Sequence, residues 1–125
     1  MHADSAKGLE SLQIWQLSMD FAERVCKRIL PCMPKEEKWS LVEQLRRSTQ
    51  SIPANIAEGC GRNGDAEFAR FLQIAMGSAS ELEYHLLLAH DLKFLSHYEH
   101  EKLANEVIDV KRMLTSFIQK LRADG

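Results

Sequence analysis

Few side chains in this sequence have the spacing that chemistry requires. Cys26, Cys32 and Cys60 form no C-x-x-C pair and no zinc-ligand pattern, so we interpret them as reduced thiols. Glu81 and His85 are spaced i, i+4, whereas di-iron helical bundles use Glu-x-x-His motifs on two helices, and this chain contains none. The sequence therefore predicts a protein that is not an enzyme and has no metal, cofactor or catalytic residue.

Three glycines match the G-x-G-x-x-G spacing of dinucleotide-binding loops: Gly59, Gly61 and Gly64. That motif requires a preceding β-strand, but the residues before Gly59 are typical of a helix. We interpret the glycines as a connection between helices. The alternative is an anion site, in which backbone N–H groups at the start of the following helix act beside Arg62.

Basic residues offer a possible nucleic-acid contact. The formal net charge of −2 argues against non-specific binding, and solvated helix faces account for the basic clusters. Phosphate contacts or ion pairs between subunits are the alternatives. The candidate nucleic-acid or anion contacts are Arg46, Arg47, Arg62, Lys111 and Arg112.

Four amphipathic helices are expected to position these residues. Apolar side chains alternate at spacings of three and four in four segments, which are residues 9–30, 35–58, 65–91 and 97–122. Helices with such short connections pack most simply as an antiparallel up-down-up-down four-helix bundle, so the fold class is all-α.

The chain length indicates one domain. We expect a disordered N-terminal tail over residues 1–8 and a single bundle over residues 9–125. No apolar run approaches the ~20 residues of a membrane span, and the N-terminus lacks an apolar signal region. We therefore expect a cytoplasmic protein with no membrane association.

Two features of the second helix stand out. Pro53 cannot donate a hydrogen bond to the carbonyl of Thr49, so the helix should kink or briefly break near Ser51. Trp39 is expected on the buried side of this helix, which should stop at the glycine-rich run beginning at Gly59.

The third helix carries a second stripe beside its apolar ladder: Phe71, Ile74, Ser78, Glu81, His85 and Leu88. With the wide apolar face of the first helix, this stripe exceeds what the inner side of a monomeric bundle requires. We expect a homo-oligomer with Ser78, Glu81 and His85 as candidate interface residues. Glu81 and His85 should share a hydrogen bond, either within the helix or between subunits.

The segment LRRSTQSIPANIAEG, from Leu45 to Gly59, is distinctive, as is the Gly61-Arg62 pair that follows it. It resembles the signature of bacterial four-helix bundle proteins also called 23S rRNA-intervening sequence proteins. Further matching residues extend the resemblance from residue 12 to about 122: Ile14-Trp15-Gln16, Pro34–Glu37, Phe71-Leu72, Ala75, Gly77-Ser78 and Glu81.

The resemblance implies a four-helix bundle that in several members assembles as a homopentameric ring. One branch serves as an accessory protein to the reverse transcriptase of diversity-generating retroelements. This implies RNA, DNA or a nucleic-acid-processing protein as an alternative partner to a second copy of the chain. The resemblance supplies no catalytic residue, cofactor or small-molecule substrate.

The signature also needs a physical interpretation. Its structural residues are Arg47, Ser51, Pro53, Asn55, Glu58, Gly59, Gly61 and Arg62. Asn55 is expected to bond backbone groups that Pro53 frees, and Glu58 to meet Arg47, Arg62 or Arg70. We hypothesise that these polar residues form a buried or interfacial network that fixes the geometry.

Overall fold

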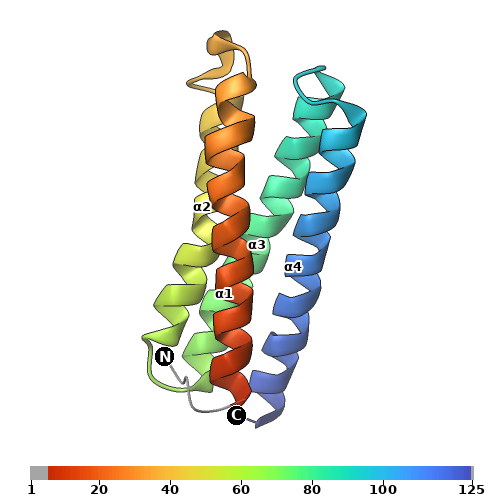
Figure 1. Cartoon of the computed structure of the whole chain (residues 1–125). Helices are drawn as coiled ribbons and strands as arrows, with labels where there is room; N and C mark the ends of the chain where they lie inside the picture. Colours follow the sequence, from red (N-terminus) through yellow and green to blue (C-terminus); the bar gives the residue numbers. More distant parts are fainter. Residues whose placement is uncertain (1–5, 125) are drawn as a thin grey trace.

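Four long α-helices make up the framework (Figure 1): α1 (Ala6–Arg24), α2 (Leu41–Cys60), α3 (Asp65–Asp91) and α4 (His97–Asp124). The computed structural model describes residues 6–124, so residues 1–5 of the expected tail lie outside the described residues, while residues 6–8 belong to α1. Consecutive helices run in opposite directions in Figure 1. The predicted all-α four-helix bundle is confirmed, and residues 6–124 contain no strand.

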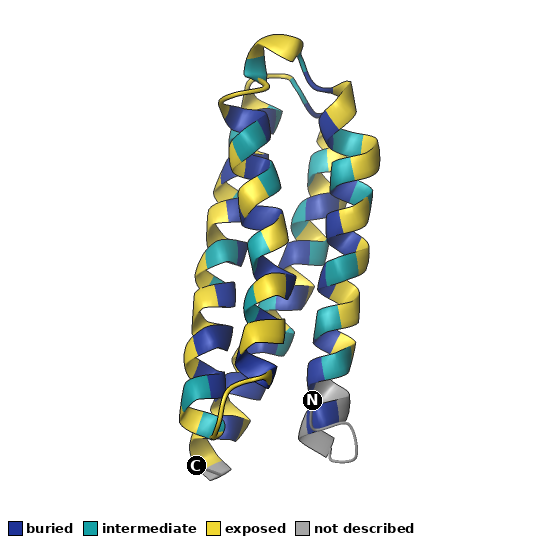
Figure 2. Cartoon of the chain, turned by 90° about the vertical axis from the view of Figure 1, so that its left-hand side faces the viewer, coloured by how far each residue is buried: buried dark blue, intermediate teal, exposed yellow. Residues whose placement is uncertain are grey.

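The core lies where the apolar ladders of the helices meet. Buried segments recur along every helix and turn towards the neighbouring helices (Figure 2). The predicted ladder of α3 is at most 3% exposed throughout: Phe68, Leu72, Ala75, Ala79, Leu82, Leu86 and Ala89. The predicted ladder of α4 is buried as well: Leu103, Val107, Val110, Leu114, Phe117 and Leu121. These two ladders are confirmed.

The three-and-four spacing of the first helix predicts a buried seam of Leu12, Trp15, Met19, Ala22, Cys26 and Ile29, and the buried stripe differs from it in part. Trp15 and Met19 are only partly buried, whereas Ile14 and Phe21 are at most 3% exposed. The small residue Ser18 completes this inner stripe, because its hydroxyl donates to the carbonyl of Trp15 (2.9 Å) and is thereby satisfied inside the core. Of the predicted seam, Ala22 is buried in the core, whereas Trp15, Met19 and Cys26 are partly buried and line the edge that faces α2.

The connection between α1 and α2 is longer than predicted. A π-helical turn (Val25–Ile29) and two 3₁₀ turns (Leu30–Cys32 and Lys35–Glu37) precede the α-helix, which begins at Leu41 and not near Lys35. Trp39 lies in this connection and is 82% exposed, so its predicted burial is wrong. The helical three-and-four spacing does not apply to Trp39, because α2 begins only at Leu41.

Helix α2 passes through Pro53 without interruption, so a break near Ser51 is wrong and the bend stays a prediction. Asn55 Nδ2 donates to the carbonyl of Ser51 (2.8 Å). The carbonyl that Pro53 frees is that of Thr49. The predicted partner of Asn55 is therefore also wrong.

Helix α2 ends at Cys60, within the predicted glycine-rich run, and Gly59 is buried in its last turn. A Cβ atom there would stand 2.9 Å from Phe68 Cδ1 and 2.9 Å from Phe71 Cβ, so the missing side chain lets α3 approach α2 closely. The turn follows Cys60, and Gly64 adopts φ +85°, a conformation that favours glycine. The helix before Gly59 is inconsistent with a dinucleotide-binding loop, as expected.

A capping box formed by Ser96 and Glu99 lies in the turn between α3 and α4. Glu99 N donates to Ser96 Oγ (3.0 Å), and Ser96 N donates to Glu99 Oε1 (3.2 Å). Beside it the His90 ring lies 4.8 Å from that of His100 and 5.6 Å from that of His97, measured between centroids.

This histidine cluster predicts a pH dependence. Partial burial, followed by the nearby His90 and His97, lowers the pKa of His100 below its ordinary 6.5, against the opposing effect of Asp91 and Glu101. The folded chain then binds fewer protons than the unfolded chain, so the stability from His100 is present above about pH 6.5 and is lost as the pH falls below it.

We expect chemical denaturation to show this loss between pH 7 and pH 5, and His100→Gln to flatten it. An NMR titration of the His100 ring reads its pKa directly. A midpoint at or above 6.5 would contradict the expected direction.

Candidate protein-interaction groove

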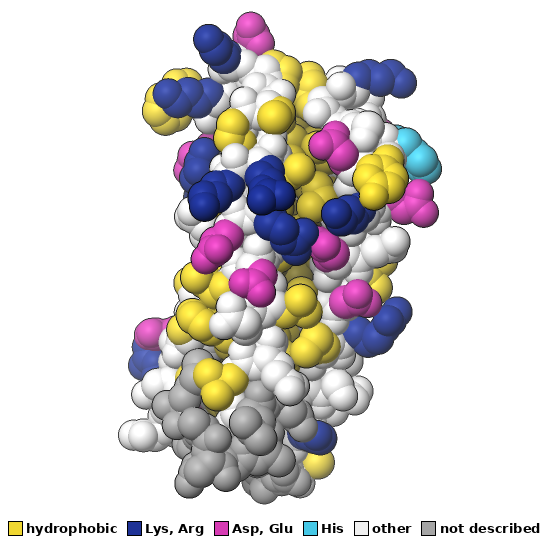
Figure 3. All heavy atoms as spheres, viewed as in Figure 1, with side chains coloured by type: hydrophobic (Ala, Val, Ile, Leu, Met, Phe, Trp, Pro, Cys, Tyr) yellow, Lys and Arg dark blue, Asp and Glu magenta, His cyan; other side chains and the backbone are white. Residues whose placement is uncertain are grey.

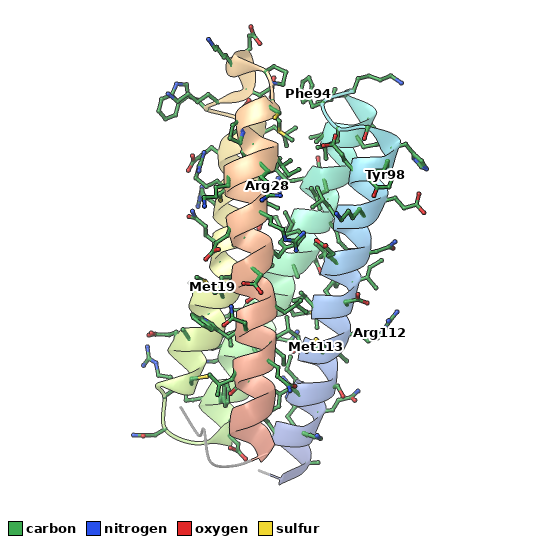
Figure 4. All side chains as sticks on the ribbon, viewed as in Figure 1. Met19, Arg28, Phe94, Tyr98, Arg112 and Met113 are labelled. Carbon is green, nitrogen blue, oxygen red and sulfur yellow. The ribbon has the colours of Figure 1, made fainter. Side chains whose placement is uncertain are left out.

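An open apolar groove lies between α1 and α2. Its volume is about 370 Å³, and apolar atoms form most of its lining. The residues that line it are Trp15, Met19, Ala22, Glu23 and Cys26 on the α1 side, and Gln50, Pro53, Ala54 and Ala57 on α2. Figure 4 shows Met19 on the side of α1 that faces α2.

Small residues on α2 produce the groove. Ala54 and Ala57 are exposed, and with Pro53 they present almost no side-chain bulk towards the larger Trp15 and Met19. An apolar floor with few polar groups at its edge is the composition of a protein–protein interface core. Trp15, Met19 and Cys26, which sequence spacing assigned to the core, therefore form one wall of a surface site.

Two polar residues of the signature, Ser51 and Asn55, lie on another face of α2, towards α3. Ser51 Oγ and Ser78 Oγ are 2.7 Å apart, and Asn55 Nδ2 donates to Ser51 Oγ (2.9 Å). This cluster joins α2 to α3 and fixes their register. The signature thus combines a polar contact inside the chain with the apolar floor of the groove.

Glu58 is outside this cluster. It pairs with Arg62 (2.8 Å) on the surface, where both side chains are about half exposed. Of the three partners considered for Glu58, the structure selects Arg62. Arg47 is exposed and has no ion-pair partner among residues 6–124.

Ser51 makes its contact inside the chain and Glu58 pairs on the surface, so alanine substitutions at the two positions should have unequal effects. Ser51→Ala should lower the free energy of unfolding by about 1 kcal/mol, because it leaves Ser78 without its partner. Glu58→Ala should change it by less, since exposed ion pairs contribute about 0–1 kcal/mol. Urea denaturation of both variants measures the difference. Equal losses, or a larger loss for Glu58→Ala, would contradict this division of the signature.

The candidate interface residues of α3 lie in different environments. Ser78 contacts Ser51 within the chain, Glu81 is exposed and His85 is 9% exposed. No hydrogen bond joins Glu81 to His85 in the described chain, and His85 Nδ1 is buried without a partner. The bond within the helix is therefore wrong, and a bond between subunits stays a prediction.

The five candidate basic contacts do not gather in one place. Arg46 lies near the start of α2 and Arg62 beyond its end, while Lys111 and Arg112 lie on α4. Four of the five are paired: Arg46 with Glu43 (4.0 Å), Arg62 with Glu58 (2.8 Å), Lys111 with Glu83 (2.5 Å) and Arg112 with Asp109 (3.5 Å).

Residues 6–124 contain neither a metal-ligand cluster nor a helix that could span a membrane. No group of three or more His, Cys, Asp or Glu side chains in the described part of the chain is placed to hold a metal ion. None of the helices there has the length and apolar character needed to span a membrane.

Comparison with known proteins agrees with this architecture. The family model for 23S rRNA-intervening sequence protein matches residues 10–116. A crystal structure from Bacteroides thetaiotaomicron, of a protein with unknown function from the S23 ribosomal protein family, has a TM-score of 0.81 and 28% sequence identity. The match covers 88% of this chain and 98% of that chain. Among curated proteins, none matches. Because the family match spans most of the sequence, this chain belongs to the 23S rRNA-intervening sequence protein family.

Proposed function

We propose that the protein is a non-enzymatic homo-oligomeric scaffold or interaction module of the cytoplasm. The observation that carries this proposal is the apolar groove between α1 and α2. Its floor consists of Pro53, Ala54 and Ala57, which belong to the signature. A second copy of the chain is the partner we assign to the groove.

A ring is the assembly that suits this arrangement. We assign a different surface of the neighbouring chain to the groove, and such head-to-tail contacts form a ring when the rotation closes. Exposed apolar side chains outside the groove are available for this role: Ile74 (41% exposed), Leu87 (49%) and Ile108 (39%). The resemblance to ring-forming relatives favours five subunits.

The assembly can be tested with a charge placed in the groove. We expect light scattering to give a wild-type mass about five times that of one 125-residue chain. Ala57→Glu should reduce it to that of a single chain, because a carboxylate cannot be buried in an apolar contact without a partner.

Ala66→Glu is the matched control. Ala66 is also exposed, lies outside the groove and is in the first turn of α3, where a negative charge is tolerated. Its assembly should be unchanged. A wild-type protein that is monomeric at micromolar concentration would exclude the proposal, as would an Ala57→Glu variant that assembles normally.

A nucleic-acid-binding accessory role is the alternative, and unpaired, exposed Arg47 is the observation that favours it. It has less support, because carboxylates of the same chain already pair with the other four candidate cations. Filter binding against RNA and DNA tests it. A steep loss of affinity with salt would support phosphate contacts, and no binding at low salt would exclude them.

A further inference from the structure

A second groove lies on another side of the bundle. It is between the start of α4 and the C-terminal end of α1 with the π-helical turn that follows it. Its volume is about 230 Å³. The residues that line it are Arg24, Arg28, Ile29, Tyr98, Glu99, Lys102 and Leu103. Figure 3 shows hydrophobic side chains between α1 and α4 on this face, with Lys and Arg side chains on both sides of them. Figure 4 places Arg28 and Tyr98 on opposite sides of the groove.

The positive charge in this groove is only partly compensated. Glu106 holds Arg24 through two contacts of 3.0 and 3.1 Å, and the Glu99 carboxylate is bonded to Ser96 in the capping box. Arg28 and Lys102 have no ion-pair partner in the described structure. Arg24, Arg28 and Lys102 outnumber Glu99, the one carboxylate in the lining, so the groove keeps a positive charge that favours an anion.

An aromatic ring stands beside these cations. Tyr98 is 74% exposed and makes no ring contact within residues 6–124. Ile29 and Leu103 add apolar surface to the same groove. An exposed aromatic ring next to basic side chains is the combination that holds a base and its phosphate, because any base can stack on the ring.

We propose that this groove binds a nucleotide unit, with the phosphate on Arg28 and Lys102 and the base on Tyr98. The size of the groove limits the ligand to about one such unit. A free nucleotide and one unit of a single strand share this chemistry. The sequence had suggested neither this site nor a small-molecule ligand.

The experiment uses the full-length protein and four probes: inorganic phosphate, adenosine, adenosine monophosphate and a short single-stranded oligonucleotide. We expect the monophosphate or the oligonucleotide to bind more tightly than phosphate or adenosine alone, with an affinity that falls as salt is added. Tighter binding of the monophosphate would indicate that the ligand is a free nucleotide, and tighter binding of the oligonucleotide would indicate a single strand. Either result supports the site.

The variants separate the two parts of the proposal. Arg28→Ala combined with Lys102→Ala should weaken binding about tenfold or more, the loss expected for a charge-assisted contact. Tyr98→Leu should weaken binding of the nucleotide but not of phosphate. Arg70→Ala is the control, since Arg70 is on α3, outside this groove and paired with Glu67.

Several outcomes would overturn the proposal: no binding of either nucleotide probe, an unchanged affinity in the Arg28/Lys102 double variant, or phosphate binding as tightly as the monophosphate. The site lies within one chain, so Ala57→Glu should still bind the ligand. Failure of the oligomer proposal is thereby distinguishable from failure of this one.

Discussion

Replacing Phe117 with alanine is expected to lower the free energy of unfolding by about 3–5 kcal/mol, the cost of removing a large buried side chain and leaving a cavity. Phe117 on α4 is fully buried and meets Phe68 of α3 edge to face, with ring centroids 5.3 Å apart and planes at 78°. The substitution thus removes an aromatic pair as well as buried area. Urea denaturation at fixed protein concentration measures the loss, because assembly makes apparent stability depend on concentration.

If the alanine variant does not fold, Phe117→Leu is the second variant that tests the burial of Phe117. It retains most of the buried volume, so its loss should be clearly smaller than that of Phe117→Ala. Losses below 1 kcal/mol for the alanine variant would contradict the position of Phe117 in the core.

Two glycine substitutions should have opposite signs. Gly59→Ala is expected to lower the free energy of unfolding by about 1–3 kcal/mol, because the new Cβ would lie 2.9 Å from Phe68 Cδ1 and Phe71 Cβ. Gly77→Ala adds its Cβ in open space on α3 and should raise the free energy of unfolding by about 0.5–1 kcal/mol through helix propensity.

Thermal or urea unfolding of the pair under identical conditions measures the difference. Gly77 is in the middle of α3 and Gly59 is in the last turn of α2, so helix propensity alone predicts no loss of stability at either position. Equal shifts would show that α3 does not approach Gly59 as closely as the structure indicates.

The sequence predicted α3 and α4 well because each carries one dominant apolar ladder. It predicted α1 less well because two apolar stripes overlap there, and spacing alone does not say which stripe faces inward. Ser18 belongs to the buried stripe of α1. A pattern of hydrophobic residues does not include it, because serine is polar. Trp39 was misplaced because two 3₁₀ turns delay the start of α2.

The candidate grooves required the three-dimensional structure. The signature identified Pro53 and its neighbours, but their role depends on how closely α1 approaches α2. Arg28 and Lys102 are far apart in the sequence, and only the packing of the π-helical turn after α1 beside α4 brings them into one groove. The i, i+4 spacing of Arg24 and Arg28 was the one sequence signal available for that site.

The central claim is that a neighbouring chain covers the groove between α1 and α2. Alkylation of cysteines in the native protein, followed by mass spectrometry, tests this claim by comparing the reaction rates of three cysteines of the same chain. Cys26 lines the groove, Cys32 is exposed outside it, and burial raises the pKa of the Cys60 thiol, which makes it a slow internal reference.

In the wild-type assembly Cys26 should react much more slowly than Cys32. Ala57→Glu should accelerate Cys26 and leave Cys32 unchanged. If Cys26 reacts as fast in the wild type as in Ala57→Glu, the groove is open to solvent and the account is wrong.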